Sequence, residues 1–60
     1  MTYSKKELKL AILSENFSDS DVLKMFLNTE IEKEDDINDI FGFFKIHRPQ
    51  ALEEIKKTIH

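Results

Sequence analysis

The sequence contains no cysteine and no tryptophan, only one glycine and one proline, and no apolar run longer than four residues. The absence of cysteine excludes disulfide bonds and thiolate metal sites, and it argues against a secreted protein of an oxidising compartment. Without a long apolar run there is no transmembrane helix, and residues 1–6 lack the apolar segment of a signal peptide. We therefore expect a cytoplasmic protein of the producing or host cell.

A chain of 60 residues is long enough for one small domain, covering residues 1–60. With 40% apolar residues and a net charge of −3, the composition is that of a folded chain. A chain this short buries only about 60% of its unfolded surface, so a homodimer remains an open option for its stabilisation. Lysine greatly outnumbers arginine, as is typical of AT-rich coding DNA. A small acidic helical protein from such a genome suggests a bacteriophage, viral or mobile-element product.

Two serines mark the starts of predicted helices. Ser4 is followed three residues later by Glu7, and Ser18 is followed in the same way by Asp21. This spacing is typical of a capping box, in which two side chains satisfy free N–H groups of the first helical turn. Pro49 cannot continue a helix but suits the first position of one. The four expected helices cover residues 5–15, 19–28, 33–47 and 49–59.

Apolar residues recur at helical spacing along each of these segments and predict the core of an all-α mini-domain. The expected core stripes are Leu8, Ala11 and Ile12; Val22, Leu23, Phe26 and Leu27; Ile37, Ile40, Phe41 and Phe44; and Ala51, Leu52, Ile55 and Ile59. The first helix also has Leu10, Leu13 and the trailing Phe17 on its opposite side. A helix with two apolar sides is expected at the centre of the bundle.

The main candidate site joins an acidic block to an aromatic one. Residues 30–39 contain six of the twelve acidic residues, more than the helix dipole alone requires. Met25, Phe43, Ile46 and Leu10 lie off the core stripes, and such side chains are either absorbed by a neighbouring helix or left as an interaction surface. We expect a non-enzymatic regulator or inhibitor that binds a partner protein with a basic surface. The predicted partner-binding residues are Glu30, Glu32, Glu34, Asp35, Asp36, Asp39, Phe43 and Ile46.

A DNA-binding helix-turn-helix regulator is the alternative. Basic and amide side chains surround the turn between the third and fourth predicted helices, where a recognition helix would begin. The residues that would contact DNA are Lys45, Arg48, Gln50, Lys56 and Lys57. Glu53 and Glu54 would then face phosphates, and the isoelectric point near 5.2 is unsuited to DNA. Nucleic acid is therefore the less favoured partner.

No catalytic, cofactor-binding or metal site is expected. The chain has two histidines, one of them the last residue, and it lacks a glycine-rich phosphate loop. Asp35, Asp36 and Asp39 do not follow the ligand spacing of a calcium-binding loop. Gly42, in the middle of the third predicted helix, costs roughly 1 kcal/mol of helix propensity relative to alanine. We expect it to allow another helix to approach closely.

Overall fold

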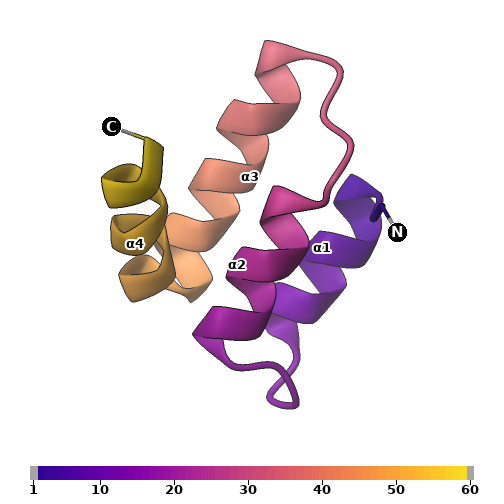
Figure 1. The fold of residues 1–60 in the computed structure, drawn as a ribbon. Helices are drawn as coiled ribbons and strands as arrows, with labels where there is room; N and C mark the ends of the chain where they lie inside the picture. The colour runs from indigo at the N-terminus through magenta and orange to yellow at the C-terminus, as the bar shows by residue number, and fades with distance from the viewer. Residues whose placement is uncertain (1, 60) are drawn as a thin grey trace.

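The protein consists of four short α-helices (Figure 1). The computed structural model describes residues 2–59, apart from the side chain of residue 59. The helices are α1 (Lys5–Leu13), α2 (Asp19–Leu27), α3 (Glu34–His47) and α4 (Pro49–Ile59). The predicted all-α fold is confirmed. Within the described residues, the β-type pairing is limited to a single parallel bridge between Tyr3 and Thr29, which ties the start of α1 to the end of α2.

The local signals for helix starts are confirmed. Ser4 and Ser18 each accept a hydrogen bond from the backbone N–H three residues ahead, and the carboxylates of Glu7 and Asp21 accept one from the backbone N–H of the cap residue. The fourth helix begins at its proline as predicted. The third helix differs, because its cap residue, Lys33, makes no capping hydrogen bond with its side chain. Three helices therefore have a start signal in the sequence, and α3 begins without one.

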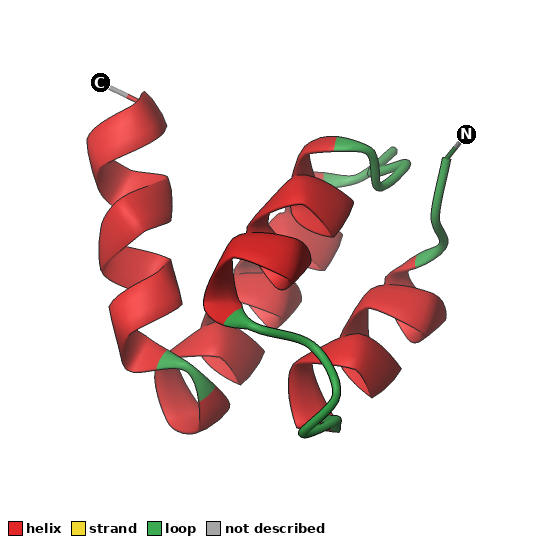
Figure 2. Ribbon diagram, turned by 60° about the horizontal axis from the view of Figure 1, so that its bottom comes forward, coloured by secondary structure: helices red, strands yellow, loops and turns green. Residues whose placement is uncertain are grey.

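The four helices form a closed ring rather than a bundle around a central helix. α1 contacts α2 and α3, and α4 contacts the same two helices from the other side. The prediction that the first helix is central is therefore wrong. Its second apolar side is not covered by another helix, since Leu10 and Leu13 remain 60% and 55% exposed. α1 and α3 run parallel, whereas the short α1–α2 loop makes these two helices antiparallel (Figures 1 and 2).

The core fills the inside of this ring. Its buried members are Leu8, Ala11, Ile12, Val22, Ile40, Phe44, Ala51, Leu52 and Ile55, all from the predicted stripes. Phe26 of α2 reaches across the ring to α3, where its ring meets Phe44 edge-on at 5.9 Å and Phe41 at 5.9 Å. Leu27 does not join the core and is 69% exposed. Leu23 and Phe41 pack against the core while partly buried, and Ile37 is half-buried. The side chain of Ile59, also predicted for the core, lies outside the described residues.

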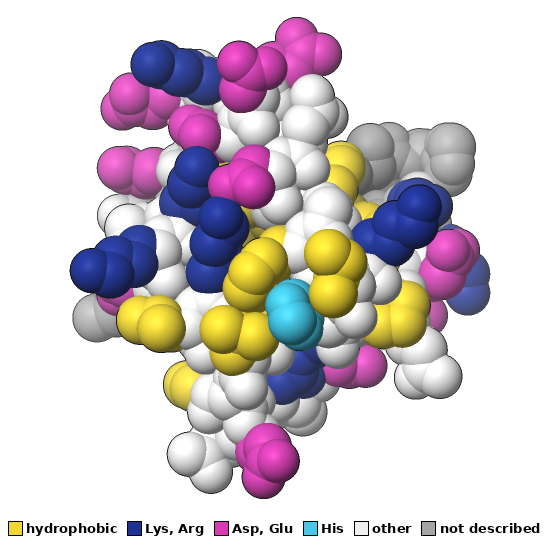
Figure 3. All heavy atoms as spheres, turned by 180° about the vertical axis from the view of Figure 1, so that it is seen from behind, with side chains coloured by type: hydrophobic (Ala, Val, Ile, Leu, Met, Phe, Trp, Pro, Cys, Tyr) yellow, Lys and Arg dark blue, Asp and Glu magenta, His cyan; other side chains and the backbone are white. Residues whose placement is uncertain are grey.

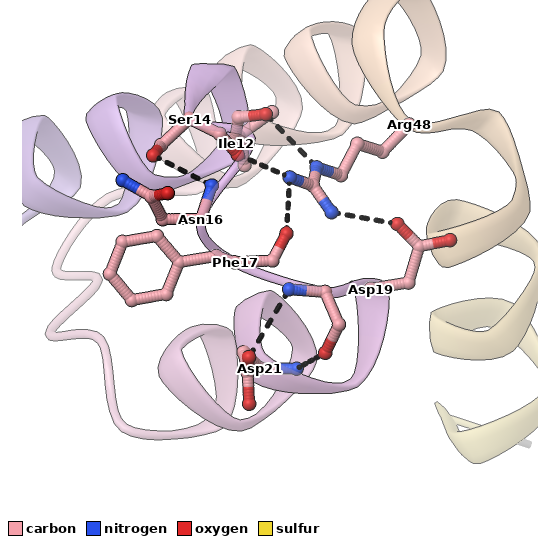
Figure 4. Close-up of polar contacts among 8 residues, drawn as sticks. Ile12, Ser14, Asn16, Phe17, Asp19, Asp21 and Arg48 are labelled. Atoms are coloured by element: carbon pink, nitrogen blue, oxygen red, sulfur yellow. Dashed lines mark hydrogen bonds and ion pairs between the residues drawn. The ribbon is translucent and has the colours of Figure 1, made fainter.

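Arg48, the single residue between α3 and α4, joins both helices to the loop between α1 and α2 (Figure 4). Its guanidinium donates to the backbone carbonyls of Ile12, Ser14 and Phe17 at 2.9, 2.8 and 2.6 Å. It also donates to the Asp19 carboxylate at 2.9 Å. These bonds satisfy carbonyl groups that the end of α1 leaves without a helical partner. α1 ends at residue 13, two residues before the predicted end, and Ser14 after it has an extended backbone.

Candidate protein-binding face

Two of the six acids in the predicted acidic block are paired with lysines of α1. Asp36 accepts a hydrogen bond from Lys5 at 3.0 Å, and Asp39 accepts one from Lys9 at 2.6 Å. Lys5 also lies 3.1 Å from the Asp39 carboxylate. The contacts follow from the parallel alignment of α1 and α3, which places the first turns of both helices side by side. These two acids therefore contribute to the α1–α3 contact.

The pairing changes the acidity of both groups. A hydrogen bond from Lys9 and a weaker contribution from Lys5 hold the pKa of the Asp39 carboxyl below its ordinary value. A hydrogen bond to Asp36 and a weaker contribution from Asp39 raise the pKa of the Lys5 ammonium. Both shifts favour the charged forms. The side chains of Lys5 and Asp39 are 39% and 47% exposed, so water and salt screen the pairs.

The other four acids of the block remain exposed and form what we term the acidic end of α3. They lie in the loop before α3 and in its first turn, and no salt bridge within the described residues involves them. The acidic end consists of Glu30, Glu32, Glu34 and Asp35. Because α3 begins among these residues, its dipole offsets part of their mutual repulsion.

Phe43 lies between a cation and an aromatic ring. The ammonium of Lys9 is 5.3 Å from the centre of its ring, and the His47 ring lies 4.6 Å away on the next turn of α3. Phe43 packs partly against the core, and so does Met25 of α2. The two off-stripe side chains are therefore half-buried, so only part of each is available to a partner.

Ile46 is the most exposed large hydrophobic residue of the described chain, at 75%. It follows Phe43 by one helical turn, so the two are neighbours on the surface of α3. Leu13 of α1 and His47 of α3 line one shallow hollow, which also has polar and charged lining residues, among them Glu15 and Gln50. We term Leu13, Phe43, Ile46 and His47 the α1–α3 apolar patch. Figure 3 shows hydrophobic side chains gathered around the histidine on this side of the molecule.

The predicted acidic and aromatic face is therefore two separate areas. Asp35 and Ile46 are eleven positions apart on α3, which corresponds to about 16 Å along the helix. The paired lysines of α1 lie between the two areas, and Figure 3 shows acidic side chains at one end, lysines below them and hydrophobic side chains beyond. A partner that contacts both areas has to extend along most of α3.

The residues of the DNA-binding alternative are used differently. The guanidinium of Arg48 is engaged by α1, its following loop and α2, and its side chain is only 13% exposed. Lys56 and Lys57 lie near Glu53 and Glu54 one turn earlier, at 3.8 and 3.6 Å. Lys45 and Gln50 are exposed. A single residue separates α3 from α4, whereas a helix-turn-helix uses a turn of about three or four residues.

A groove between α1 and α2 was not predicted. Its apolar lining includes Leu10, Ala11, Phe17 and Met25. Leu10 is 60% exposed and Phe17 is 39% exposed, so the groove is open along its length. The apolar second side of the first helix is the signal in the sequence that points to it. That side was assigned to a central position and instead faces this groove and solvent.

Within residues 2–59 no three acidic or histidine side chains lie close enough together to hold a metal ion. No helix of this part of the chain is long and apolar enough to span a membrane.

Comparison with known proteins found no matching protein-family model, no similar curated protein and no similar solved structure. Function is therefore inferred from the surface itself.

Proposed function

We propose that the protein is a small non-enzymatic regulator or inhibitor that acts by binding another protein along α3. The observation that supports this best is the exposure of Ile46, at 75%, one helical turn after the half-buried Phe43 on α3. Removing such a side chain from water favours association by roughly 1.5–3 kcal/mol. A contiguous apolar patch on a small polar protein is typical of an interaction surface.

The acidic end of α3 supplies the second part of the proposed surface. Its four carboxylates lack lysine partners within the described residues, so their charge is available to attract a basic surface. A fitting partner has basic side chains about 16 Å from an apolar pocket that accepts Ile46. The regulator would act by covering that surface of its target. A bacteriophage, viral or mobile-element origin, in which the target belongs to the host, is part of this proposal.

The test is affinity capture with purified tagged protein from lysate of the source organism. The first variant, Glu34→Lys with Asp35→Lys, reverses two unpaired acids. The second, Ile46→Asp, removes the apolar anchor. A matched control, Glu53→Lys with Glu54→Lys, makes the same charge change on α4. We expect one host protein to be retained by the wild type and the control, and to be lost with either of the first two variants.

Two results would contradict the proposal. Retention of the same protein by all four chains would place the interface elsewhere on the surface. Recovery of nucleic acid, lost after nuclease treatment, would favour the DNA-binding alternative through the exposed Lys45 and Gln50. Salt dependence of capture provides an independent check, because contacts between exposed charges weaken at high ionic strength.

A further inference from the structure

Gly42 lies in the middle of α3, and neither its backbone conformation nor a contact within the described chain requires a glycine there. No residue of the described backbone has a positive φ, so Gly42 has an ordinary helical conformation that alanine also adopts. A β-carbon built on it would meet nothing within 4 Å. The predicted close approach of another helix is therefore not found within the chain. Glycine nonetheless weakens a helix, and it does so here in a domain of small core.

The surface around Gly42 is exposed on all sides. Residues three and four positions away are surface neighbours on a helix. Here these are Asn38, Asp39, Lys45 and Ile46, and all four are exposed. The lack of a side chain at the centre leaves bare backbone beside the 75% exposed Ile46. Helices pack closer together where the contacting side chains are small, so this site favours a close helix crossing.

The charges around the glycine indicate which helix approaches. The acid, Asp39, lies before Gly42 and the base, Lys45, lies after it. Lys5 and Lys9 of the same chain both contact Oδ2 of Asp39, and neither of these ion pairs uses Oδ1. If a second copy of α3 crosses antiparallel at Gly42, the acid of each copy lies at the level of the lysine of the other. A parallel crossing would place like charges at the same level. The antiparallel arrangement is two-fold symmetric, so the same contact between Asp39 of one copy and Lys45 of the other occurs twice.

We propose that two copies of this chain associate through α3, antiparallel, with Gly42 of each copy at the crossing. Ile46 of each helix then lies at the level of Asn38 of the other, one turn from the bare backbone at Gly42. This inference does not depend on the proposed partner protein. Because both surfaces include Ile46, self-association and partner binding would compete, and dilution would favour the partner.

Gly42→Ala is the decisive variant, since the fold and the dimer predict opposite effects. In the monomer the substitution adds helix propensity in open space, so the urea midpoint should rise at low protein concentration. At the crossing, the two added methyl groups push the helices apart. We expect the dissociation constant measured by sedimentation equilibrium, between about 10 µM and 1 mM protein, to rise at least tenfold.

Charge reversal tests the orientation. Lys45→Glu should weaken the dimer by about tenfold because it faces Asp39 of the other copy, whereas Lys24→Glu on α2 makes the same charge change away from α3 and should not. A wild-type chain that stays monomeric throughout the concentration range would overturn the proposal. So would dimers unaffected by Gly42→Ala, or weakened equally by Lys45→Glu and Lys24→Glu.

Discussion

The Arg48 guanidinium donates through Nη1 to the Asp19 carboxylate at 2.9 Å, which links the α3–α4 junction to the first residue of α2. The same side chain binds three backbone carbonyls. A planar guanidinium offers five N–H donors in a fixed arrangement. The three nitrogens of Arg48 together make the four hydrogen bonds described here. A residue that sequence patterns suggest for DNA contact therefore has a structural role.

Arg48→Lys is expected to destabilise the fold by about 2 kcal/mol. The ammonium keeps the charge but cannot reach all of the carbonyls at once, so two part-buried carbonyls and one exposed carbonyl lose their common donor. Urea unfolding at low protein concentration measures the change. Lys6→Ala, at an exposed position of α1, serves as the control and should lie within about 0.5 kcal/mol of the wild type. Equal stability of the two variants would contradict this role.

Phe44→Ala is expected to unfold the protein at room temperature. Phe44 is fully buried, and its removal costs about 3–5 kcal/mol, which is comparable with the whole stability of so small a domain. Phe43→Ala removes a half-buried ring of the same size and should cost only about 1 kcal/mol. Far-ultraviolet circular dichroism distinguishes the two. A folded Phe44→Ala variant would mean that the core closes around the missing ring.

Asp39→Asn tests the ion pairs between α1 and α3 through their pH dependence. The folded-state pKa of Asp39 lies below the ordinary value of 3.8, so its contribution is present above that pH and is lost as pH falls through the lowered pKa. The variant should therefore be less stable at neutral pH and lose less stability on acidification. Urea midpoints at about pH 7 and pH 3 check this. An Asp39→Asn variant that keeps the wild-type dependence on pH would contradict this role of the ion pair.

The same ion pairs predict that the folded protein also loses stability at alkaline pH. The pKa of Lys5 is raised above 10.5, so its contribution is present below that value and is lost as pH rises through the raised pKa. Lys5→Met should remove this alkaline loss. High salt should reduce the acidic and alkaline effects together, because both charges are partly exposed.

Lys33→Ser is expected to stabilise the protein. Lys33 has the extended backbone of a helix cap, with φ −125° and ψ 144°, but its side chain makes no capping hydrogen bond. A serine there accepts a bond from the first turn of α3 and should add about 0.5–1 kcal/mol relative to Lys33→Ala. Thermal unfolding of the two variants measures the difference. A lower unfolding temperature for the serine variant would show that the first turn is already satisfied.

The features that the sequence predicted are local ones. A capping box needs only two side chains three positions apart, and the start at Pro49 needs only the proline ring, so both are readable without knowledge of the fold. The buried stripes follow in the same way from helical spacing. The third helix, which has no capping serine, was nevertheless placed to within one residue by its apolar periodicity.

The features that were not predicted depend on how distant helices align. The pairs between Lys5 or Lys9 and the acids of α3 require the parallel arrangement of α1 and α3, which helical periodicity does not specify. Three backbone carbonyls that meet at one guanidinium leave no pattern in the side chains at all. For the same reason, the sequence does not show that Leu13 and Leu27 are exposed, because this depends on which helices lie side by side in the ring.

The contacts of Arg48 also constrain the order of events during synthesis. The carbonyls it binds lie 31 to 36 residues earlier in the chain. Until residue 48 is in place, water takes the position of the guanidinium at these carbonyls. The buried residues of α4, which complete the core, follow Arg48 in the chain. The domain is therefore expected to fold in one step after α4 has been synthesised, rather than helix by helix as it emerges.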